Sequence, residues 1–254
     1  MAASAGHTPQ AGGLCHDAGL GPPRASAEAP ENTLAAIAKA VELGADGVET
    51  DVQRSADGRL VVVHDETVDR TTDGSGRVAE LEWAQLARLD ASGGDARFAG
   101  ERLPLLEQVL ELLAPAGLVL NIELKDSLER CPGMDLQVME LVRQAGMAER
   151  VWLSSFNHVA LAQTRGAALG LPIGLLYQAT LWRPERYAAG FGAQAVHPGS
   201  WTLSEPGLVD RLHEAGLRVH PWTVDEPEHL SAMPGLGVDA VIANRVSRAL
   251  ALRD

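Results

Sequence analysis

Short apolar runs alternate with longer segments of helical periodicity from residue 30 to the C-terminus, and this alternation restricts the chain to few architectures. It is typical of repeated βα units, which bury a parallel sheet beneath helices. The first helix is expected over residues 31–43, between the cap candidates Asn32 and Thr33 and the terminating Gly44. Strands are expected at residues 48–52, 118–124, 151–155, 173–176, 195–197, 218–224 and 240–242. A parallel sheet of this size predicts an α/β barrel, whose eighth strand should precede residue 30.

Three stretches depart from the regular alternation. After the turn signal Asp57-Gly58, the run 60–63 is expected to be a hairpin arm rather than a barrel strand. The polar segment 66–101 has few periodic apolar positions and is expected to be a loop-rich insertion after the second strand. Residues 1–29 are rich in Gly, Ala and Pro and contain no run of branched apolar residues, so their composition predicts a coil. The first barrel strand is atypical for this reason.

Net charge and composition exclude several classes of partner. The chain has 34 acidic and 21 basic residues among 254, a formal charge of −13, so its field repels nucleic acids and anionic membranes. No apolar stretch approaches the length of a membrane span, and no stable membrane insertion is expected. The two cysteines, Cys15 and Cys131, have no metal-ligand spacing and fit a reducing compartment. Because residues 1–10 also lack the features of a secretion signal, we expect a cytoplasmic protein.

Acidic residues stand in two of the expected barrel strands. Glu49 and Asp51 occupy alternate positions of one strand, so their carboxylates point to the same face, which in a barrel is the interior. Two buried like charges this close are tolerated mainly when a cation lies between them. Glu123 and Lys125 come at the end of the strand 118–124, at the mouth where such barrels hold their sites. Three carboxylates with oxygen donors alone favour Mg²⁺ or Ca²⁺ over zinc, and Lys125 is suited to bind a phosphate oxygen.

Each of these residues also has a purely structural interpretation. A glutamate or lysine at a strand end is more often a solvated tip than a ligand. His64 closes an apolar run before Asp65, which either orients the imidazole for catalysis or begins a turn. Trp222 either lines a ligand pocket or fills the core, which is the commoner role for a large aromatic residue. The residues alone leave these alternatives open.

Several short motifs follow one another in a fixed order from about Ala25 to the C-terminus. They are Ala29-Pro30-Glu31-Asn32-Thr33, the stretch 44–52, Val62-Val63-His64-Asp65, Asn121-Ile122-Glu123-Leu124-Lys125, Ser154-Ser155-Phe156 and Pro221-Trp222-Thr223-Val224. The ordered set is specific, although each motif alone is weak. It resembles the glycerophosphodiester phosphodiesterase family. The resemblance implies a TIM (β/α)8 barrel.

The resemblance also implies a reaction. It points to a metal-dependent phosphodiesterase that hydrolyses glycerophosphodiesters, which are small-molecule substrates, to glycerol 3-phosphate and an alcohol. By family analogy the divalent cation, Mg²⁺ or Ca²⁺, would be held by Glu49, Asp51 and Glu123. The cation would neutralise charge that develops on phosphorus, while a base takes a proton from a hydroxyl group and an acid protonates the leaving group.

The same resemblance implies roles for four further residues. Lys125 would bind the phosphate, and Trp222 would border the glycerol side of the substrate. His64 would be one of two histidines that act as general acid and base, through a cyclic phosphate formed by the adjacent glycerol hydroxyl. Glu31, in the Pro-Glu-Asn motif, would help to organise the site.

The N-terminal part of the chain departs from the family pattern. In the family the first barrel strand ends in His-Arg-Gly, which supplies the second histidine and a phosphate-binding arginine, whereas this chain has Pro22-Pro23-Arg24 there. Proline transfers no protons and removes donors from a strand ladder. His16 lies about six residues upstream, roughly 20 Å along an extended chain, so it does not take over the role. A smaller departure is Asn244, where the family usually has Asp.

The missing motif predicts a strongly reduced activity, because losing one general acid or base typically costs about 10²- to 10⁴-fold in rate. The alternative is a catalytically silent phosphoester-binding protein built on the same barrel. The chain then divides into an atypical segment 1–24, disordered or translated out of frame, and a phosphodiesterase domain at 25–254.

The out-of-frame hypothesis predicts a particular nucleotide sequence. The codons CCA-CCG-CGG encode Pro-Pro-Arg, and read one base later they contain CAC-CGC-GG, the beginning of His-Arg-Gly. We expect the coding strand over Gly21 to Ala25 to yield His-Arg-Gly in another frame, which nucleotide sequencing of the locus tests. If no frame yields this motif, residues 22–24 are a genuine variant with a rewritten first strand.

Overall fold

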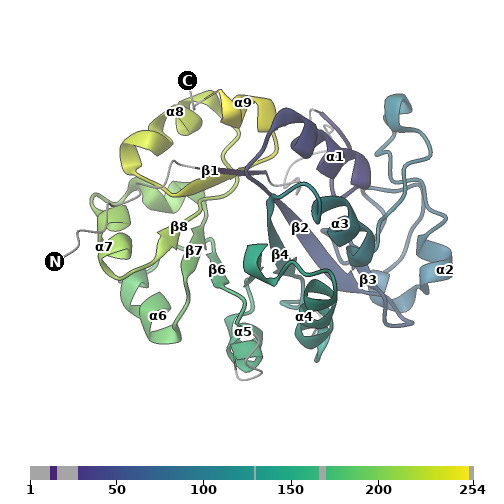
Figure 1. The fold of residues 1–254 in the computed structure, drawn as a ribbon, viewed down its shortest axis with the longest axis horizontal. Helices are drawn as coiled ribbons and strands as arrows, with labels where there is room; N and C mark the ends of the chain where they lie inside the picture. The colour runs from purple at the N-terminus through teal and green to yellow at the C-terminus, as the bar shows by residue number, and fades with distance from the viewer. Residues whose placement is uncertain (1–11, 16–27, 129, 166–169, 252–254) are drawn as a thin grey trace.

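The strands of the computed structural model form one sheet with helices around its outside (Figure 1). The structure describes residues 12–15, 28–128, 130–165 and 170–251. The strands are β1 (Gly12–Cys15), β2 (Gly47–Arg54), β3 (Leu60–Val62), β4 (Val119–Leu124), β5 (Val151–Ser155), β6 (Ile173–Tyr177), β7 (Ala195–Pro198), β8 (Arg218–Val219) and β9 (Ala240–Ala243). The helices are α1 (Leu34–Leu43), α2 (Trp83–Leu86), α3 (Leu106–Leu113), α4 (Met134–Gln144), α5 (His158–Arg165), α6 (Pro184–Phe191), α7 (Leu208–Glu214), α8 (Pro227–Leu236) and α9 (Val246–Leu250).

The sheet has the strand order of an α/β barrel, β8-β7-β6-β5-β4-β2-β1-β9, and every neighbouring pair along this path is parallel. β3 lies off the path and pairs antiparallel with β2, as the hairpin arm expected from the sequence. Within the described residues, ladder pairing does not join β8 to β9. Backbone hydrogen bonds connect these two ends instead, from Asp239 to Val219, from Ile242 to Pro221 and from Val224 to Ile242.

A strand precedes residue 30, contrary to the predicted coil. β1 lies between β2 and β9 and pairs in parallel with both. Composition is a weak guide to such a strand, because ladder hydrogen bonds on both edges set its place. The expectation of a coil is therefore wrong for residues 12–15. The rest of the segment 1–24, including His16 and Pro22-Pro23-Arg24, lies outside the described residues.

The turn before α1 is fixed by local hydrogen bonds. Thr33 caps the helix, and its side chain accepts a hydrogen bond from the Ala36 N–H at 3.2 Å. Gly44 ends α1 in the left-handed conformation, with φ 80°, which a residue without a Cβ adopts at little cost. Asn32 also has a positive φ, 54°, which asparagine tolerates better than most residues. This conformation turns the Asn32 side chain towards β2, where it bonds to Asp51.

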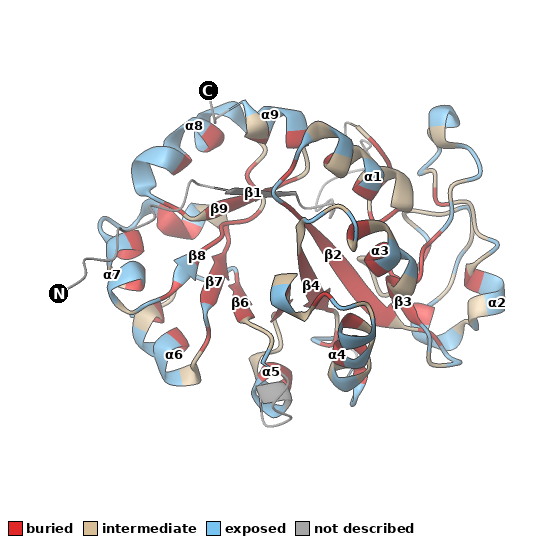
Figure 2. Cartoon of the chain, in the orientation of Figure 1, coloured by how far each residue is buried: buried red, intermediate tan, exposed pale blue. Residues whose placement is uncertain are grey.

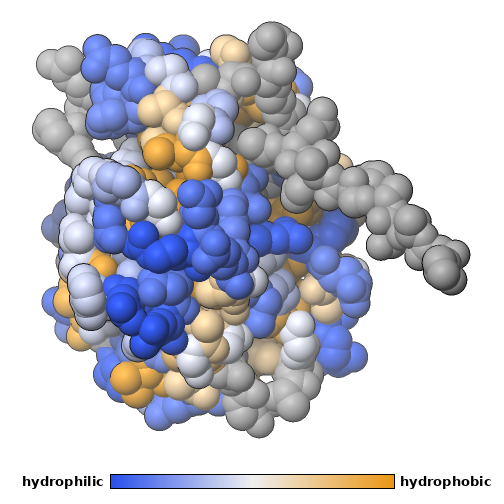
Figure 3. All heavy atoms as spheres, turned by 90° about the vertical axis from the view of Figure 1, so that its left-hand side faces the viewer, coloured by the Kyte–Doolittle hydropathy of each residue, from blue (hydrophilic) through white to orange (hydrophobic). Residues whose placement is uncertain are grey.

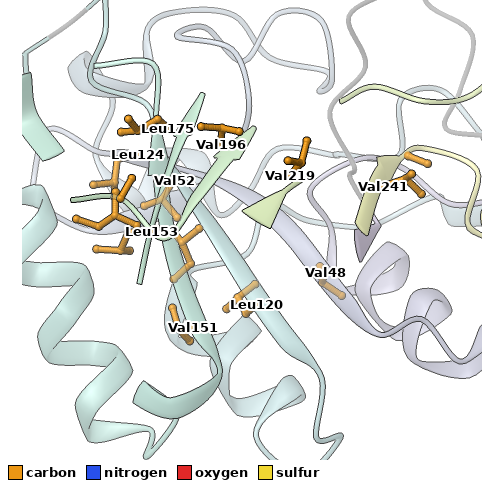
Figure 4. Packing of buried hydrophobic residues seen from close by; sticks show 14 of the residues in the cluster. Val48, Val52, Leu120, Leu124, Val151, Leu153, Leu175, Val196, Val219 and Val241 are labelled. Atoms are coloured by element: carbon orange, nitrogen blue, oxygen red, sulfur yellow. The ribbon is translucent and has the colours of Figure 1, made fainter. Parts of the chain in front are cut away.

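Alternate residues of the central strands lie in two different environments. Branched apolar side chains pack with the helices in the main core, among them Val48, Val52, Leu120 and Leu124 (Figure 4). The residues between them are polar and also buried, among them Glu49, Asp51, Asn121 and Glu123. Figure 2 shows β2, β4, β6 and β7 buried along most of their length, whereas the helices are exposed on their outer sides. The barrel interior is thus the face that carries polar groups.

Residues 66–101 form the expected insertion, which contains α2 and short helical turns in place of barrel strands. The insertion lies to one side of the barrel (Figure 1). It has a small hydrophobic core of its own, to which the hairpin arm β3 contributes. We call this cluster the satellite core; its buried members are Val61, Val63, Val68, Val78, Leu86, Ala91, Leu103 and Leu105.

The outer surface of the barrel is largely hydrophilic on the side that carries α6 and α7. Figure 3 shows this side, and hydrophilic residues cover most of it. Most of the buried apolar residues of α6 and α7, such as Ala188 and Leu212, belong to the main core with the strands. No helix in the described part of the chain combines the length and the apolar content that a membrane crossing requires.

Two glycines predict opposite effects on stability. Gly174 in β6 lies against the ring of His197 in β7, and an added Cβ would overlap that ring. We expect Gly174→Ala to lower the free energy of unfolding by about 1–3 kcal/mol, the usual cost of overpacking. Gly190 in α6 is exposed with open space around it, so Gly190→Ala should raise the free energy of unfolding by about 0.5–1 kcal/mol. Urea unfolding measures the free energy change in each variant. A Gly174→Ala variant with an unchanged free energy of unfolding would contradict the close packing on His197.

Candidate active site

Three carboxylates meet inside the barrel. Glu49 and Asp51 come from β2 and Glu123 comes from β4, where parallel pairing sets Asp51 beside Glu123. One oxygen from each residue lies within 4.8 Å of the others. All three residues are buried, with at most 5% of their surface exposed. The structure thus brings together the three acidic residues that the sequence analysis singles out, and Glu123 is not a solvated strand tip.

The carboxylate cluster fits a hard divalent cation. Each residue offers a carboxylate oxygen, the donor that Mg²⁺ and Ca²⁺ prefer. Without a cation the buried charges repel one another and are poorly solvated. Burial raises the pKa of Glu123 to about 7; Lys125 opposes the rise, and the charge of Asp51 adds to it. A cation that displaced the proton would relieve this repulsion, as expected of a metal site.

Lys125 follows β4 and reaches two of the same carboxylates. Its Nζ lies 3.0 Å from Glu123 Oε1 and 3.4 Å from Asp51 Oδ1, and only 12% of its side chain is exposed. Burial lowers the pKa of Lys125, but the charges of Asp51 and Glu123 outweigh burial and hold the pKa above its usual value. Lys125 therefore remains a cation at the cluster and offsets part of the buried negative charge.

The side chain of Asn32, in the turn before α1, forms hydrogen bonds with both the carboxylate and the backbone N–H of Asp51. Asn32 Nδ2 donates to Asp51 Oδ2 at 2.9 Å. Asn32 Oδ1 accepts from the Asp51 N–H at 3.1 Å and from Thr50 Oγ1 at 2.9 Å. Sequence analysis names Asn32 only as a cap candidate, but the helix cap is Thr33, and the Asn32 side chain serves the carboxylate cluster.

His64 lies two residues after β3 and lines a pocket together with Glu49 and Glu123. Its Nδ1 lies 2.6 Å from Asp65 Oδ1, so Asp65 orients the ring and leaves Nε2 for a ligand. Burial lowers the pKa of His64, but the hydrogen bond with Asp65 and the charge of Asp51 outweigh burial and keep the pKa above its usual 6.5. An imidazole is the side-chain group most often used to exchange protons in proteins.

Aromatic residues form one wall of the pocket. Trp222 is 5% exposed and lines the pocket beside Phe156, whose ring meets it edge-on with 5.4 Å between centroids. Trp201 approaches Trp222 in the same manner at 5.7 Å. The Trp222 Nε1–H donates to the His197 carbonyl at 2.8 Å, which fixes the indole. Trp222 is therefore both a buried core residue and a pocket wall, so the two interpretations of the sequence are compatible.

Two residues near the site were not singled out by sequence reasoning. Asn121 lies two residues before Glu123 on the same face of β4, lines the pocket, and donates through Nδ2 to Ser154 Oγ at 2.9 Å. Strand alternation alone points to Asn121. Arg70 lies in the insertion and donates to Asp65 Oδ2 at 2.6 Å. No periodicity marks Arg70, because its partners are reached only through the fold.

The hydrogen bonds of Asn244 to Asp225 explain why this position carries an amide rather than a carboxylate. It follows β9 and donates through Nδ2 to Asp225 Oδ2 at 2.7 Å, while its N–H donates to Asp225 Oδ1 at 2.8 Å. An aspartate at this position would set two carboxylates against each other. The departure from the family residue is thus matched to its neighbour in this chain.

The raised pKa of Glu123 predicts a pH-dependent response to cations. A divalent cation must displace the Glu123 proton, so its stabilising effect grows as the pH rises through about 7. We expect Mg²⁺, Ca²⁺ or Mn²⁺ to raise the Tm more at pH 8 than at pH 6, as measured by calorimetry. In the metal-free protein the raised pKa destabilises the fold as the pH rises from 4.5 towards 7, because the unfolded carboxyl ionises first.

Glu123→Gln should abolish the pH-dependent Tm shift by removing the proton and one ligand together. Glu42→Gln is the matched control, because Glu42 lies on α1 with 69% of its side chain exposed. That variant should keep the full response to the cation. Equal cation-induced shifts in Glu123→Gln and the unaltered protein would contradict the assignment of the site.

The chain is similar in sequence to one family of known proteins. Residues 25–248 match the model of the glycerophosphoryl diester phosphodiesterase family. A glycerophosphodiester phosphodiesterase of Caldanaerobacter subterraneus subsp. tengcongensis is 42% identical over 220 residues, which cover 86% of this chain and 90% of that protein. One from Bacillus altitudinis is 36% identical over 230 residues, covering 89% of this chain and 93% of that protein.

Solved structures have the same fold. The glycerophosphodiester phosphodiesterase from Agrobacterium tumefaciens superposes with a TM-score of 0.80 and 29% identity over 95% of this chain and 100% of that one. The Oleispira antarctica phosphodiesterase, solved in complex with the product sn-glycerol-3-phosphate, gives a TM-score of 0.82 and 26% identity over 94% and 95% of the two chains. With its carboxylate cluster in the barrel interior and this similarity along nearly its whole length, the chain belongs to the glycerophosphoryl diester phosphodiesterase family and has its TIM-barrel fold.

Proposed function

We propose that this chain hydrolyses glycerophosphodiesters to glycerol 3-phosphate and an alcohol. The observation that carries the proposal is a single pocket lined by His64, Glu49, Glu123 and Trp222, which combines a proton-transfer group, metal ligands and an apolar wall. The product bound to the Oleispira antarctica relative supports a small phosphoester as substrate. The charge of −13 supports such a substrate over nucleic acid, and the sparse cysteines support a cytoplasmic site of action.

Glu49, Asp51 and Glu123 would hold the divalent cation. The all-oxygen donor set favours Mg²⁺ or Ca²⁺. When bound, the cation supplies positive charge that polarises the phosphoryl group. The chain itself contributes a fixed arrangement of ligands, because Asn32 and the strand ladder hold Asp51 in place.

His64 is the proposed proton-transfer group. Its Nε2 is free of the Asp65 hydrogen bond and would take the proton of the adjacent glycerol hydroxyl or give one to the departing alcohol. Asp65 stabilises the protonated ring, in keeping with the raised pKa of His64.

Lys125 and Trp222 would bind the two ends of the glycerophosphate. Lys125 stays protonated beside the cluster. Once a cation occupies the carboxylates, its ammonium group would donate a hydrogen bond to a phosphate oxygen. Trp222 would border the glycerol, with Phe156 supporting its ring edge-on.

The Pro22-Pro23-Arg24 sequence limits the proposed activity. A second histidine and an arginine are missing from the chain where the family carries them, so half of the acid/base pair is absent. The same observation favours a second candidate function, a catalytically silent phosphoester-binding protein. Both candidates use the same carboxylates and the same lysine, and they differ only in turnover.

Restoring the motif should raise the activity. We expect slow, metal-stimulated release of glycerol 3-phosphate from glycerophosphocholine, and an increase of about 10²- to 10⁴-fold in kcat for the Pro22→His, Pro23→Arg double variant. His64→Asn should abolish release in both backgrounds. A coupled enzymatic assay of glycerol 3-phosphate, with and without chelator, measures each rate.

Three results decide between the candidates. A gain in the double variant that is lost on adding His64→Asn supports the hydrolase. Turnover that is unchanged by the double variant means that the missing residues do not limit the rate. Cation-dependent binding of glycerol 3-phosphate with no turnover in any variant would establish the silent phosphoester-binding protein instead.

A further inference from the structure

The guanidinium of Arg70 joins two carboxylates that are far apart in the sequence, those of Asp65 and Glu31. Arg70 Nε donates to Asp65 Oδ2 at 2.6 Å, and Nη2 donates to Asp65 Oδ1 at 3.1 Å. On the other side, Nη1 donates to Glu31 Oε2 at 2.7 Å and Nη2 to Glu31 Oε1 at 2.5 Å. Both contacts are bidentate, the geometry in which an arginine holds a carboxylate most firmly.

The carboxylate of Asp65 is also the partner of the proton-transfer group. Asp65 Oδ1 lies 2.6 Å from His64 Nδ1 and also accepts from Arg70 Nη2. Burial raises the pKa of Asp65, but the hydrogen bonds of His64 and Arg70 outweigh burial and hold the pKa well below its usual range. Asp65 therefore stays ionised and keeps its place between the two. A displacement of its carboxylate would turn the imidazole with it.

The carboxylate of Glu31 belongs to the turn that holds a metal ligand. Glu31 directly precedes Asn32, whose Nδ2 donates to Asp51 Oδ2 at 2.9 Å. Asn32 is only 2% exposed, so this turn has little room to shift. Of these two successive residues, Glu31 thus contacts the Arg70 guanidinium and Asn32 contacts the Asp51 carboxylate. The same turn therefore helps to position both Asp51 and, through Arg70 and Asp65, the imidazole of His64.

The insertion presents Arg70 from a segment that is anchored in the satellite core. Val68, two residues earlier, is fully buried in the satellite core. Its N–H donates to the Gly76 carbonyl at 3.0 Å, and its carbonyl accepts from Thr72 Oγ1 at 2.7 Å. The Arg70 side chain itself is 28% exposed and Glu31 is 13% exposed, so the pair is largely withdrawn from water. Partly buried, bidentate pairs of this kind hold their geometry better than exposed ones.

We propose that Arg70 is a positioning residue for the reaction: through Asp65 it fixes the His64 imidazole, and through Glu31 it ties that ring to the turn that holds Asp51. The kinetic consequences of this inference rest on the proposed function, whereas the effect on the ring rests on geometry alone. Four of the five N–H groups of Arg70 donate to the carboxylates of Asp65 and Glu31, so Arg70 is expected to act through these neighbours.

Substitution of Arg70 should act on turnover rather than on substrate affinity. In the metal-supplied full chain we expect Arg70→Met to lower kcat about 10- to 100-fold, with KM changed by less than about threefold. Arg70→Lys should retain a higher rate than Arg70→Met, because an ammonium group keeps the positive charge but cannot form the bidentate contacts of a guanidinium. Glu31→Gln should lower kcat in the same direction. Arg102→Met is the matched control, because Arg102 directly follows the insertion, has 48% of its side chain exposed, and forms a longer ion pair with Asp90, at 3.7 Å, besides hydrogen bonds to backbone carbonyls.

Nuclear magnetic resonance reports the ring without any turnover. Histidine-selective ¹⁵N labelling resolves the eight histidines, and His64→Gln assigns the His64 signals. We expect a downfield His64 Nδ1–H resonance, typical of a ring held on a carboxylate, in the unaltered protein and in Arg102→Met. The resonance should broaden or disappear in Arg70→Met and Glu31→Gln.

The outcomes separate this inference from the proposed function. If no variant and no background releases glycerol 3-phosphate but the His64 resonance responds to Arg70→Met, the proposed function fails and the positioning role stands. A kcat for Arg70→Met equal to that of Arg102→Met, with an unchanged His64 resonance, overturns the inference. So does a rise in KM at constant kcat, which would make Arg70 a substrate ligand. Should Arg70→Met not fold, Arg70→Lys and Glu31→Gln decide by the same two measurements.

Discussion

The fold of this chain has to accommodate three buried carboxylates, and the structure around them is arranged to offset that charge. An unpaired buried carboxylate costs on the order of several kcal/mol, so the cluster would not persist without compensation. Lys125 supplies a cation at 3.0 Å from Glu123, and Asn32 supplies a hydrogen-bond donor to Asp51. The negative charge that remains is what a divalent ion would neutralise. The negative charge that destabilises the metal-free fold is therefore what makes the carboxylate cluster a candidate metal site.

The barrel keeps packing and chemistry on opposite faces of the same strands. In β4, Leu120, Ile122 and Leu124 belong to the main core with the helices, whereas Asn121 and Glu123 line the pocket. A change in the helices can thus repack the core without moving a ligand. The imidazole of His64 comes from outside this alternation, on the hairpin arm, and needs its own support from Asp65 and the insertion.

Local patterns predict the parts of the site that strands carry and miss the parts that tertiary contacts create. The period of two along a strand places Glu49 and Asp51 on one face, which needs no knowledge of the fold. The strand count of a barrel predicts a strand before residue 30, but composition does not indicate β1, because ladder bonds from both neighbours rather than residue preference define it. Arg70 was not predicted, because its partner Glu31 is 39 positions away and no local sequence pattern indicates such a contact. The aromatic wall was found only as an alternative, since burial and pocket lining coincide at Trp222.

The satellite core is a separate cluster from the main hydrophobic core, and β3 contributes to both: Val61 lies in the satellite core, whereas Leu60 and Val62 pack in the main core with β2. Proteins open locally in units that share a core, so the insertion can loosen while the barrel stays folded. Changes of apolar side chains in the satellite core, such as Val78 and Leu86, would therefore alter how firmly the His64 ring is held without any substitution in the barrel strands.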